Sequence, residues 1–115
     1  MAEMKVYRRL ETPMIFCNVY ALTMSDTGVL TQGALSDAGS SMKIIIEDNT
    51  GEVVEALADM VKDATGKYSY GGTDAASYTI TATDNIGVWN YECRATNGTR
   101  VATARGSFEV KEQVA

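Results

Sequence analysis

Few side chains of this sequence could take part in catalysis, and the residue types that most catalytic sites require are missing. The 115 residues contain no histidine, which removes Ser-His-Asp and Cys-His nucleophilic sites together with the most common zinc ligand. Asp63, Asp74 and Asp84 fall at predicted turns and do not form a paired set of carboxylates. Gly71-Gly72 has no flanking Lys-Ser/Thr sequence, and no G-x-G-x-x-G sequence is present, so no phosphate-binding loop is predicted. We therefore expect no enzymatic activity and no cofactor.

The segment Asp48-Asn49-Thr50-Gly51-Glu52 has the composition of a calcium-binding loop. It lacks the alternating oxygen ligands and the distal glutamate that an EF-hand supplies. The same residues also encode a hairpin turn in which Gly51 takes a positive φ angle. The turn is the preferred interpretation, and no metal site is predicted.

Cys17 and Cys93 are the two cysteines of the chain, and both fall on the predicted inner faces of strands. A disulfide between them would join two sheets, but two buried thiols also explain the pattern, because cysteine packs as a small hydrophobic side chain. No export signal is recognised, since Glu11 and Pro13 precede the apolar run at residues 14–22 and no small-residue cleavage site follows. The expected compartment is therefore reducing, which favours thiols and leaves both alternatives open.

Tyrosines and one long loop provide the candidates for a binding surface. Exposed tyrosines would stack on sugar rings, whereas buried ones would be core or cross-strand partners, which is the favoured interpretation. Residues 29–41 are small, polar and glycine-bearing, which predicts a long loop that is either flexible or functional. The candidate interaction surface consists of Leu35, Ser36, Asp37, Tyr68, Tyr70 and Tyr78.

The elements that position these residues are predicted to be β-strands. Residues 84–95 form a turn followed by strict alternation, with Trp89, Tyr91, Cys93 and Ala95 on one face. This period of two, with large apolar groups on one side, is typical of a half-buried strand. The stretch is therefore predicted to be an interior strand, and Trp89 is predicted to fill the core.

An all-β domain is predicted around this stretch, with turn signals about every 8–12 residues, as in antiparallel sandwiches. Residues 52–62 also fit a helical stripe, so a short helix is the alternative to a strand that passes into irregular chain. Seven or eight strands are expected, at residues 4–10, 14–24, 42–48, 52–55, 67–70, 78–83, 88–95 and 101–110. The expected organisation is an N-terminal edge strand or arm at 1–13, one sandwich at 14–110, and a frayed tail at 111–115.

The charge and hydropathy of the chain argue against two classes of binding partner, nucleic acids and membranes. A formal charge of −5 and a pI near 4.6 argue against a nucleic-acid surface, which requires clustered lysine and arginine. Lys5, Arg8 and Arg9 are expected to lie on a solvated strand edge. No run approaches the roughly 20 apolar residues of a membrane span, so no membrane partner is expected.

Three short motifs resemble a known architecture: Gly66-Lys67-Tyr68-Ser69-Tyr70, Gly87-Val88-Trp89-Asn90-Tyr91-Glu92-Cys93-Arg94-Ala95 and Gly106-Ser107-Phe108-Glu109-Val110. With a hairpin at residues 43–54, they resemble the immunoglobulin-like modules of tailed-phage structural proteins and bacterial surface proteins, over residues 14–110. The chain departs from antibody-type domains because no Trp follows Cys17 and the one Trp lies four residues before Cys93.

The resemblance implies a single immunoglobulin-like antiparallel β-sandwich. It also implies a virion structural protein of a tailed phage, in a head decoration, neck or tail, that docks to other virion subunits. Such a protein would form a homo-oligomer or symmetric assembly and would be made in the host cytoplasm without a signal peptide or a transmembrane segment. The alternative that the resemblance implies is an adhesion module that binds a carbohydrate or a cell surface.

Overall fold

The structure, a computed structural model, describes residues 4–24, 26–28, 30–36, 39, 41–72, 77–97 and 99–113. Within these ranges all regular structure is β and no helix is present. The strands are β1 (Lys5–Arg8), β2 (Ile15–Asn18), β3 (Tyr20–Met24), β4 (Leu30–Leu35), β5 (Ser41–Glu47), β6 (Val53–Asp59), β7 (Val61–Ala64), β8 (Lys67–Tyr70), β9 (Gly87–Asn97) and β10 (Arg100–Lys111).

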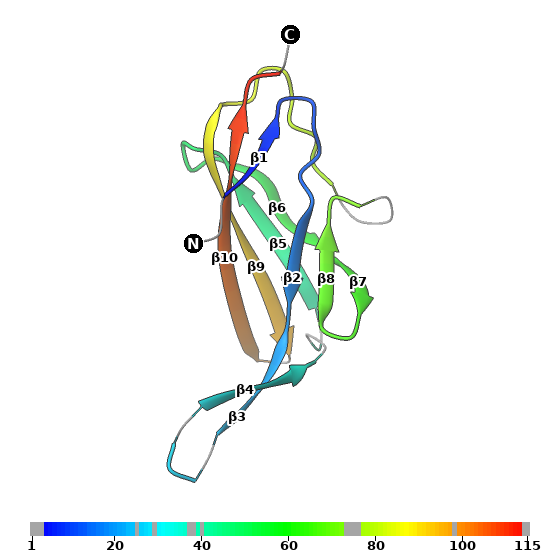
Figure 1. Cartoon of the computed structure of the whole chain (residues 1–115), viewed down its shortest axis with the longest axis vertical. Helices are drawn as coiled ribbons and strands as arrows, with labels where there is room; N and C mark the ends of the chain where they lie inside the picture. Colours follow the sequence, from blue (N-terminus) through cyan, green and yellow to red (C-terminus); the bar gives the residue numbers. More distant parts are fainter. Residues whose placement is uncertain are drawn as a thin grey trace.

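The strands form a five-stranded sheet in the order β1-β10-β9-β5-β6, a three-stranded sheet in the order β2-β8-β7, and the separate pair β3-β4 (Figure 1). The expectation of a purely antiparallel arrangement is wrong at one edge, because β1 pairs with β10 in parallel, with Lys5 opposite Phe108. A tight hairpin forces antiparallel pairing, but nearly the whole chain separates these two strands, so no such constraint applies.

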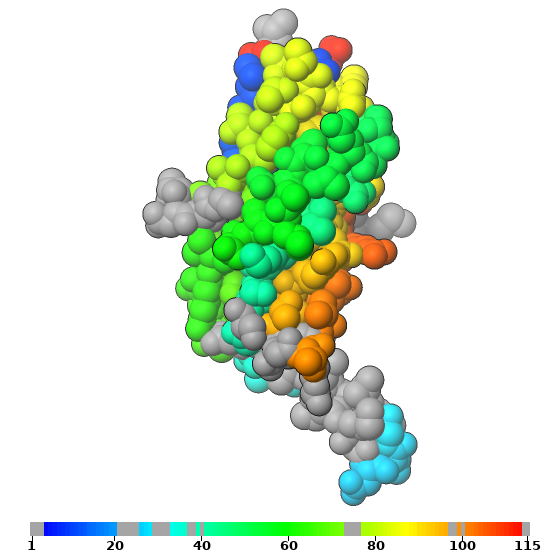
Figure 2. All heavy atoms as spheres, turned by 180° about the vertical axis from the view of Figure 1, so that it is seen from behind, coloured from blue at the N-terminus to red at the C-terminus, as the bar shows by residue number. Residues whose placement is uncertain are grey.

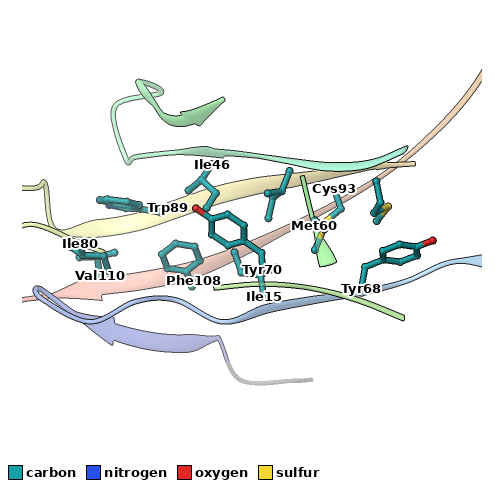
Figure 3. Close-up of a cluster of buried hydrophobic side chains, with 12 residues drawn as sticks. Ile15, Ile46, Met60, Tyr68, Tyr70, Ile80, Trp89, Cys93, Phe108 and Val110 are labelled. Carbon is teal, nitrogen blue, oxygen red and sulfur yellow. The ribbon is translucent and has the colours of Figure 1, made fainter. Parts of the chain in front are cut away.

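The hydrophobic core lies between the five-stranded and the three-stranded sheet (Figure 3). The predicted alternation along β9 is confirmed: Trp89 and Cys93 are buried, whereas Val88 and Asn90 are exposed. Trp89 is completely buried, and its indole N–H donates to the Asn85 carbonyl oxygen at 2.9 Å. The most polar atom of the largest core side chain is therefore satisfied inside the core.

The predicted hairpin at residues 43–54 is confirmed as β5 and β6, and Gly51 in its turn has a φ of 86°. The short helix considered for residues 52–62 is wrong, because this segment forms β6 and then β7 in the opposite sheet. Met60 lies between the two strands and donates its backbone N–H to the Met42 carbonyl at 2.9 Å. Pairing with β5 and β8 satisfies the backbone of these residues without helical hydrogen bonds.

Three other expectations need correction. Together with β7, which was not predicted, they account for the ten strands among the described residues, against the seven or eight expected. The run at 14–24 is divided at Val19 into β2 and β3, and the predicted loop at 29–41 contains strand β4. Residues 78–83 do not form a strand. Of these residues, Ile80 accepts from the Leu10 N–H at 2.6 Å and donates to the Glu11 carbonyl at 3.0 Å, which is too little pairing for a ladder.

Candidate interaction surface

The most prominent feature outside the two packed sheets is the pair β3-β4, called the β3–β4 hairpin below. It extends away from the end of the sheets along the long axis of a molecule that measures 58 × 31 × 22 Å (Figure 1). Figure 2 shows the same projection from behind, with the segment near residue 27 at its tip. The hairpin therefore projects beyond the two packed sheets.

The register of the hairpin places apolar residue types together. Tyr20, Leu22 and Met24 occupy alternate positions of β3 in the sequence. The backbone register pairs them with Leu35, Gln32 and Leu30 on β4, with a register shift between Tyr20 and Leu22. Five of these six paired positions carry apolar residue types. An isolated two-stranded hairpin is marginally stable in water, so this element gains most from a further partner.

Backbone contacts at the base of the hairpin attach it to the three-stranded sheet. Val19 donates its N–H to the Gly66 carbonyl at 2.7 Å and accepts from the Ser36 N–H at 2.9 Å. Gly66 lies so close that an added Cβ would come within 2.7 Å of the Val19 oxygen and 2.8 Å of the Ser36 nitrogen. Leu35 and Ser36, two of the predicted surface residues, thus lie at the hairpin base, while Asp37 lies outside the described residues.

The favoured interpretation of Tyr68 and Tyr70 as core residues is confirmed, and the alternative in which they stack on sugar rings is wrong, because both side chains are buried between the sheets (Figure 3). They are the register partners of Cys17 and Ile15 on β2. The Tyr70 hydroxyl donates to Glu55 Oε2 at 2.8 Å, and burial followed by this carboxylate raises the Tyr70 pKa above its ordinary value. Neither ring is available to a ligand.

Tyr78 is half-buried and belongs to the core margin. Its ring packs against Trp89 with centroids 6.2 Å apart, and its hydroxyl donates to Asp84 Oδ2 at 2.6 Å. Burial, and then the hydrogen bond to Asp84, raise the Tyr78 pKa to about 12. The structure therefore does not unite the predicted candidates: two lie at the hairpin base, two in the core and one beside Trp89.

Cys17 on β2 and Cys93 on β9 form a disulfide that joins the two sheets. Of the two alternatives left by the sequence, the bridged form is therefore the one present. Both residues lie on the inner faces of their strands, which is the placement expected from their alternation.

The Asp48 carboxylate has the contacts of a turn-stabilising residue. Asp48 Oδ1 accepts from the Thr50 N–H at 2.8 Å, the Thr50 hydroxyl at 2.6 Å and the Glu52 N–H at 3.1 Å. Asn85 donates to Oδ2 at 3.1 Å. The Thr50 hydroxyl, with the other donors, holds the Asp48 pKa below its usual value against the opposing effect of burial. In the part of the chain that the structure describes, no group of three or more histidine, cysteine, aspartate or glutamate side chains is placed to hold a metal.

Reasoning from the sequence missed two interaction features. The first is β4, whose signal was the pair of apolar residues Leu30 and Leu35 on either side of Thr31-Gln32-Gly33. The second is Phe16, which is 59% exposed on β2 although its neighbours Ile15 and Cys17 point inward. Alternation within residues 14–24 puts Phe16 on the face opposite Ile15 and Cys17, but both faces are largely apolar, so the sequence did not show which one is uncovered.

Comparison of the chain with known protein families, with curated proteins and with solved structures finds no match. Among the described residues, no helix is long and apolar enough to cross a membrane.

Proposed function

We propose that this protein is a non-enzymatic structural subunit that docks to neighbouring protein subunits through the β3–β4 hairpin. The observation that carries the proposal is a two-stranded, largely apolar hairpin that extends beyond the packed sheets (Figure 1). A partner that covers this hairpin removes apolar surface from water at about 25 cal/mol per Å² and supplies hydrogen bonds to its outer backbone groups.

The charge of the hairpin supports a protein partner. Residues 20–35 contain one side chain that is charged at neutral pH, Asp26, in a chain of net charge −5. Interface centres are depleted in charged residues relative to the rest of a protein surface. The hairpin is therefore the part of this acidic chain that approaches another protein with the least desolvation of charge.

We further propose that the two packed sheets are immunoglobulin-like. In that architecture strands G, F, C and C′ face strands B, E and D, and a disulfide joins B to F. The orders β10-β9-β5-β6 and β2-β8-β7, with the Cys17–Cys93 bridge between β2 and β9, support this assignment. The position of the Trp differs, because Trp89 lies on β9 and not on the strand that corresponds to C.

The assembly that we propose is a virion of the tailed-phage type, as a head decoration, neck or tail component. The support for this class is the resemblance of residues 14–110 to immunoglobulin-like modules of such proteins, together with the docking hairpin. The adhesion alternative has no comparable support, because of the three tyrosines that it required, Tyr68 and Tyr70 are buried and Tyr78 is half-buried.

The test separates particles from the source cells on a density gradient. An antibody raised against the purified chain then detects the protein in each fraction. We expect the chain to co-sediment with the particles. A hairpin-shortened variant, in which Asn-Gly replaces residues 23–31 between the register partners Leu22 and Gln32, should lose this association, because two residues close a tight hairpin without the distal strands. Asp26→Asn, which keeps the hairpin length, is the matched control. Free protein at the top of the gradient, with no particle association, would refute the function.

A further inference from the structure

Strand β10 has a long side without a partner. It contains twelve residues, of which four, residues 108–111, pair with β1. The remaining eight, residues 100–107, pair with β9 on one side, and no described strand pairs with them on the other. This second side of residues 100–107 is called the open edge below. An exposed strand edge of this length is a template for pairing with another chain.

The backbone groups that face the open edge follow from one hydrogen bond. The Lys111 carbonyl accepts from the Arg9 N–H at 3.0 Å, so the backbone groups of Lys111 point to the side of β1. In an antiparallel pair, residues that bond to the partner strand alternate with residues that do not. The register with β9 runs from 100 to 110 without a shift. The N–H and C=O groups of four residues therefore point to the open edge: Val101, Thr103, Arg105 and Ser107.

An apolar hollow lies beside the upper end of this edge, where β2 and β10 approach each other from opposite sheets. Its volume is about 320 Å³, and Ser107 of the open edge is among its lining residues. Most of the lining is apolar or aromatic and includes Met14, Phe16, Tyr91 and Phe108. A strand added at the open edge would direct alternate side chains toward this hollow, because side chains of a strand alternate between its faces.

The β3–β4 hairpin has the properties that the open edge requires. Strand β3 carries apolar residue types at alternate positions, namely Tyr20, Leu22 and Met24, and its outer side has no partner strand among the described residues. Its five residues fit within the eight of the open edge. Charge does not oppose the contact. Residues 100–107 contain two arginines and no carboxylate, and one of them, Arg105, pairs with Glu92 of its own chain at 2.9 Å. The hairpin region 20–35 contains a single aspartate, so the repulsion between two chains of net charge −5 is small at this contact.

We propose that the open edge of β10 accepts the β3–β4 hairpin of a second copy of this chain as an added strand. The proposal rests on the function proposed above, in which the hairpin is the docking element, and it names the partner. The contact joins two different surfaces, so each copy donates one hairpin and accepts another. Such head-to-tail contacts generate closed rings or open filaments.

The first experiment blocks the acceptor with Thr103→Pro and measures the mass of the purified full chain by sedimentation velocity over a range of concentrations. The proline removes an N–H that points to the open edge and no hydrogen bond to β9, so the sheet is expected to persist. Thr103→Ala keeps the N–H and is the matched control. We expect the unmodified chain and Thr103→Ala to self-associate, and Thr103→Pro to sediment as a 12.4 kDa monomer, with its dissociation constant raised about tenfold or more.

The second experiment mixes Thr103→Pro with the hairpin-shortened variant. Thr103→Pro retains a hairpin without an acceptor edge, and the hairpin-shortened variant retains an edge without a donor. Each alone should be monomeric, and the mixture should form a one-to-one dimer that grows no further. Thermal unfolding and the count of free thiols check that both variants fold with the disulfide intact.

Three results would overturn the inference. The first is no self-association of the unmodified chain at any concentration, and the second is a mixture that stays monomeric although both variants are folded. The third is self-association that Thr103→Pro leaves unchanged, since the contact then lies elsewhere. The outcome is separable from that of the particle experiment. A chain that binds particles through the hairpin but never binds itself retains the proposed function and loses the second-copy partner. A chain that self-associates in this way but binds no particle retains strand addition and loses the virion role.

Discussion

Tyr91 lies across Gly106: the two residues are direct register partners on β9 and β10, and a Cβ atom at Gly106 would overlap the phenol ring. The Tyr91 ring also stacks on Phe108, with centroids 6.4 Å apart and planes at 24°. Because Gly106 has no side chain, the Tyr91 ring can lie over it. This ring packs on Phe108 of the core and also lines the hollow beside the open edge.

Gly106→Ala is expected to lower the free energy of unfolding by about 1–3 kcal/mol, because the new methyl group must displace the ring or the strand. Urea denaturation measures the loss. The matched test is the double variant Gly106→Ala with Tyr91→Ala, in which the cost should be less than the sum of the two single changes, since removal of the ring removes the overlap. Strict additivity would show that Tyr91 is not the obstacle.

Reduction of the Cys17–Cys93 disulfide should destabilise the chain by about 2–4 kcal/mol, because the bridge restricts a long loop of the unfolded state. The two cysteines are 76 residues apart. The measurement is the free energy of unfolding in urea with and without reductant. The double variant Cys17→Ala with Cys93→Ala is the control and should not respond to reductant. An unmodified chain that is equally insensitive would contradict the prediction.

Stability should fall at alkaline pH because two tyrosines are held in their neutral form. The folded-state pKa of Tyr78 is about 12, whereas a tyrosine in an unfolded chain titrates near 10. The unfolded chain therefore loses its proton first, so this contribution is complete below about pH 10 and is lost as the pH rises toward 12. Tyr70 acts in the same direction. Urea midpoints across this range give the slope, which should become shallower in Tyr78→Phe; an identical slope in both proteins would refute the assignment.

The Asp48 carboxylate should matter at the opposite end of the pH range. Its pKa is lowered in the folded state, first by the Thr50 hydroxyl, so the folded chain holds the ionised form more tightly than the unfolded chain. The associated stability is present above the unfolded pKa of about 3.9 and is lost as the pH falls through the folded value. Thermal midpoints of the unmodified chain and of Asp48→Asn measure it. The gap between the two should be largest near neutral pH and should narrow in acid; a constant gap would contradict the linkage.

The fold could be predicted where one face of a strand meets the core. Alternation along β9 identified Trp89 and Cys93 as inner residues, and both are buried. The hairpin of β5 and β6 was also evident, because turn residues separate two β-forming runs. Burial of one face requires apolar residues at every second position of the strand, and this alternation can be recognised in the sequence.

Elements that lie outside the core were harder to predict. Strand β4 was expected to be a loop, because residues 29–41 are small, polar and glycine-bearing. It forms a strand by pairing with β3. Residues 78–83 were predicted to be a strand and are not. They alternate in sequence like a strand, but Ile80 pairs through its backbone only with Leu10 and Glu11, and the Thr81 carbonyl accepts from the nearby Asp84 N–H at 3.3 Å, so no ladder forms. In both cases the presence or absence of a neighbouring strand, and not local preference, decided the structure.

The sequence by itself determined an all-β chain, with Trp89 in its core and cysteines on inner strand faces, because burial leaves a periodic record along each strand. Only the tertiary structure decided that Cys17 meets Cys93, that Tyr68 and Tyr70 face inward, and that β10 keeps an open edge beside a projecting hairpin. These properties depend on which strands become neighbours. Pairing between distant segments is set by the packing of the whole chain. The local sequence of a strand therefore does not reveal whether its edge is paired with a neighbouring strand.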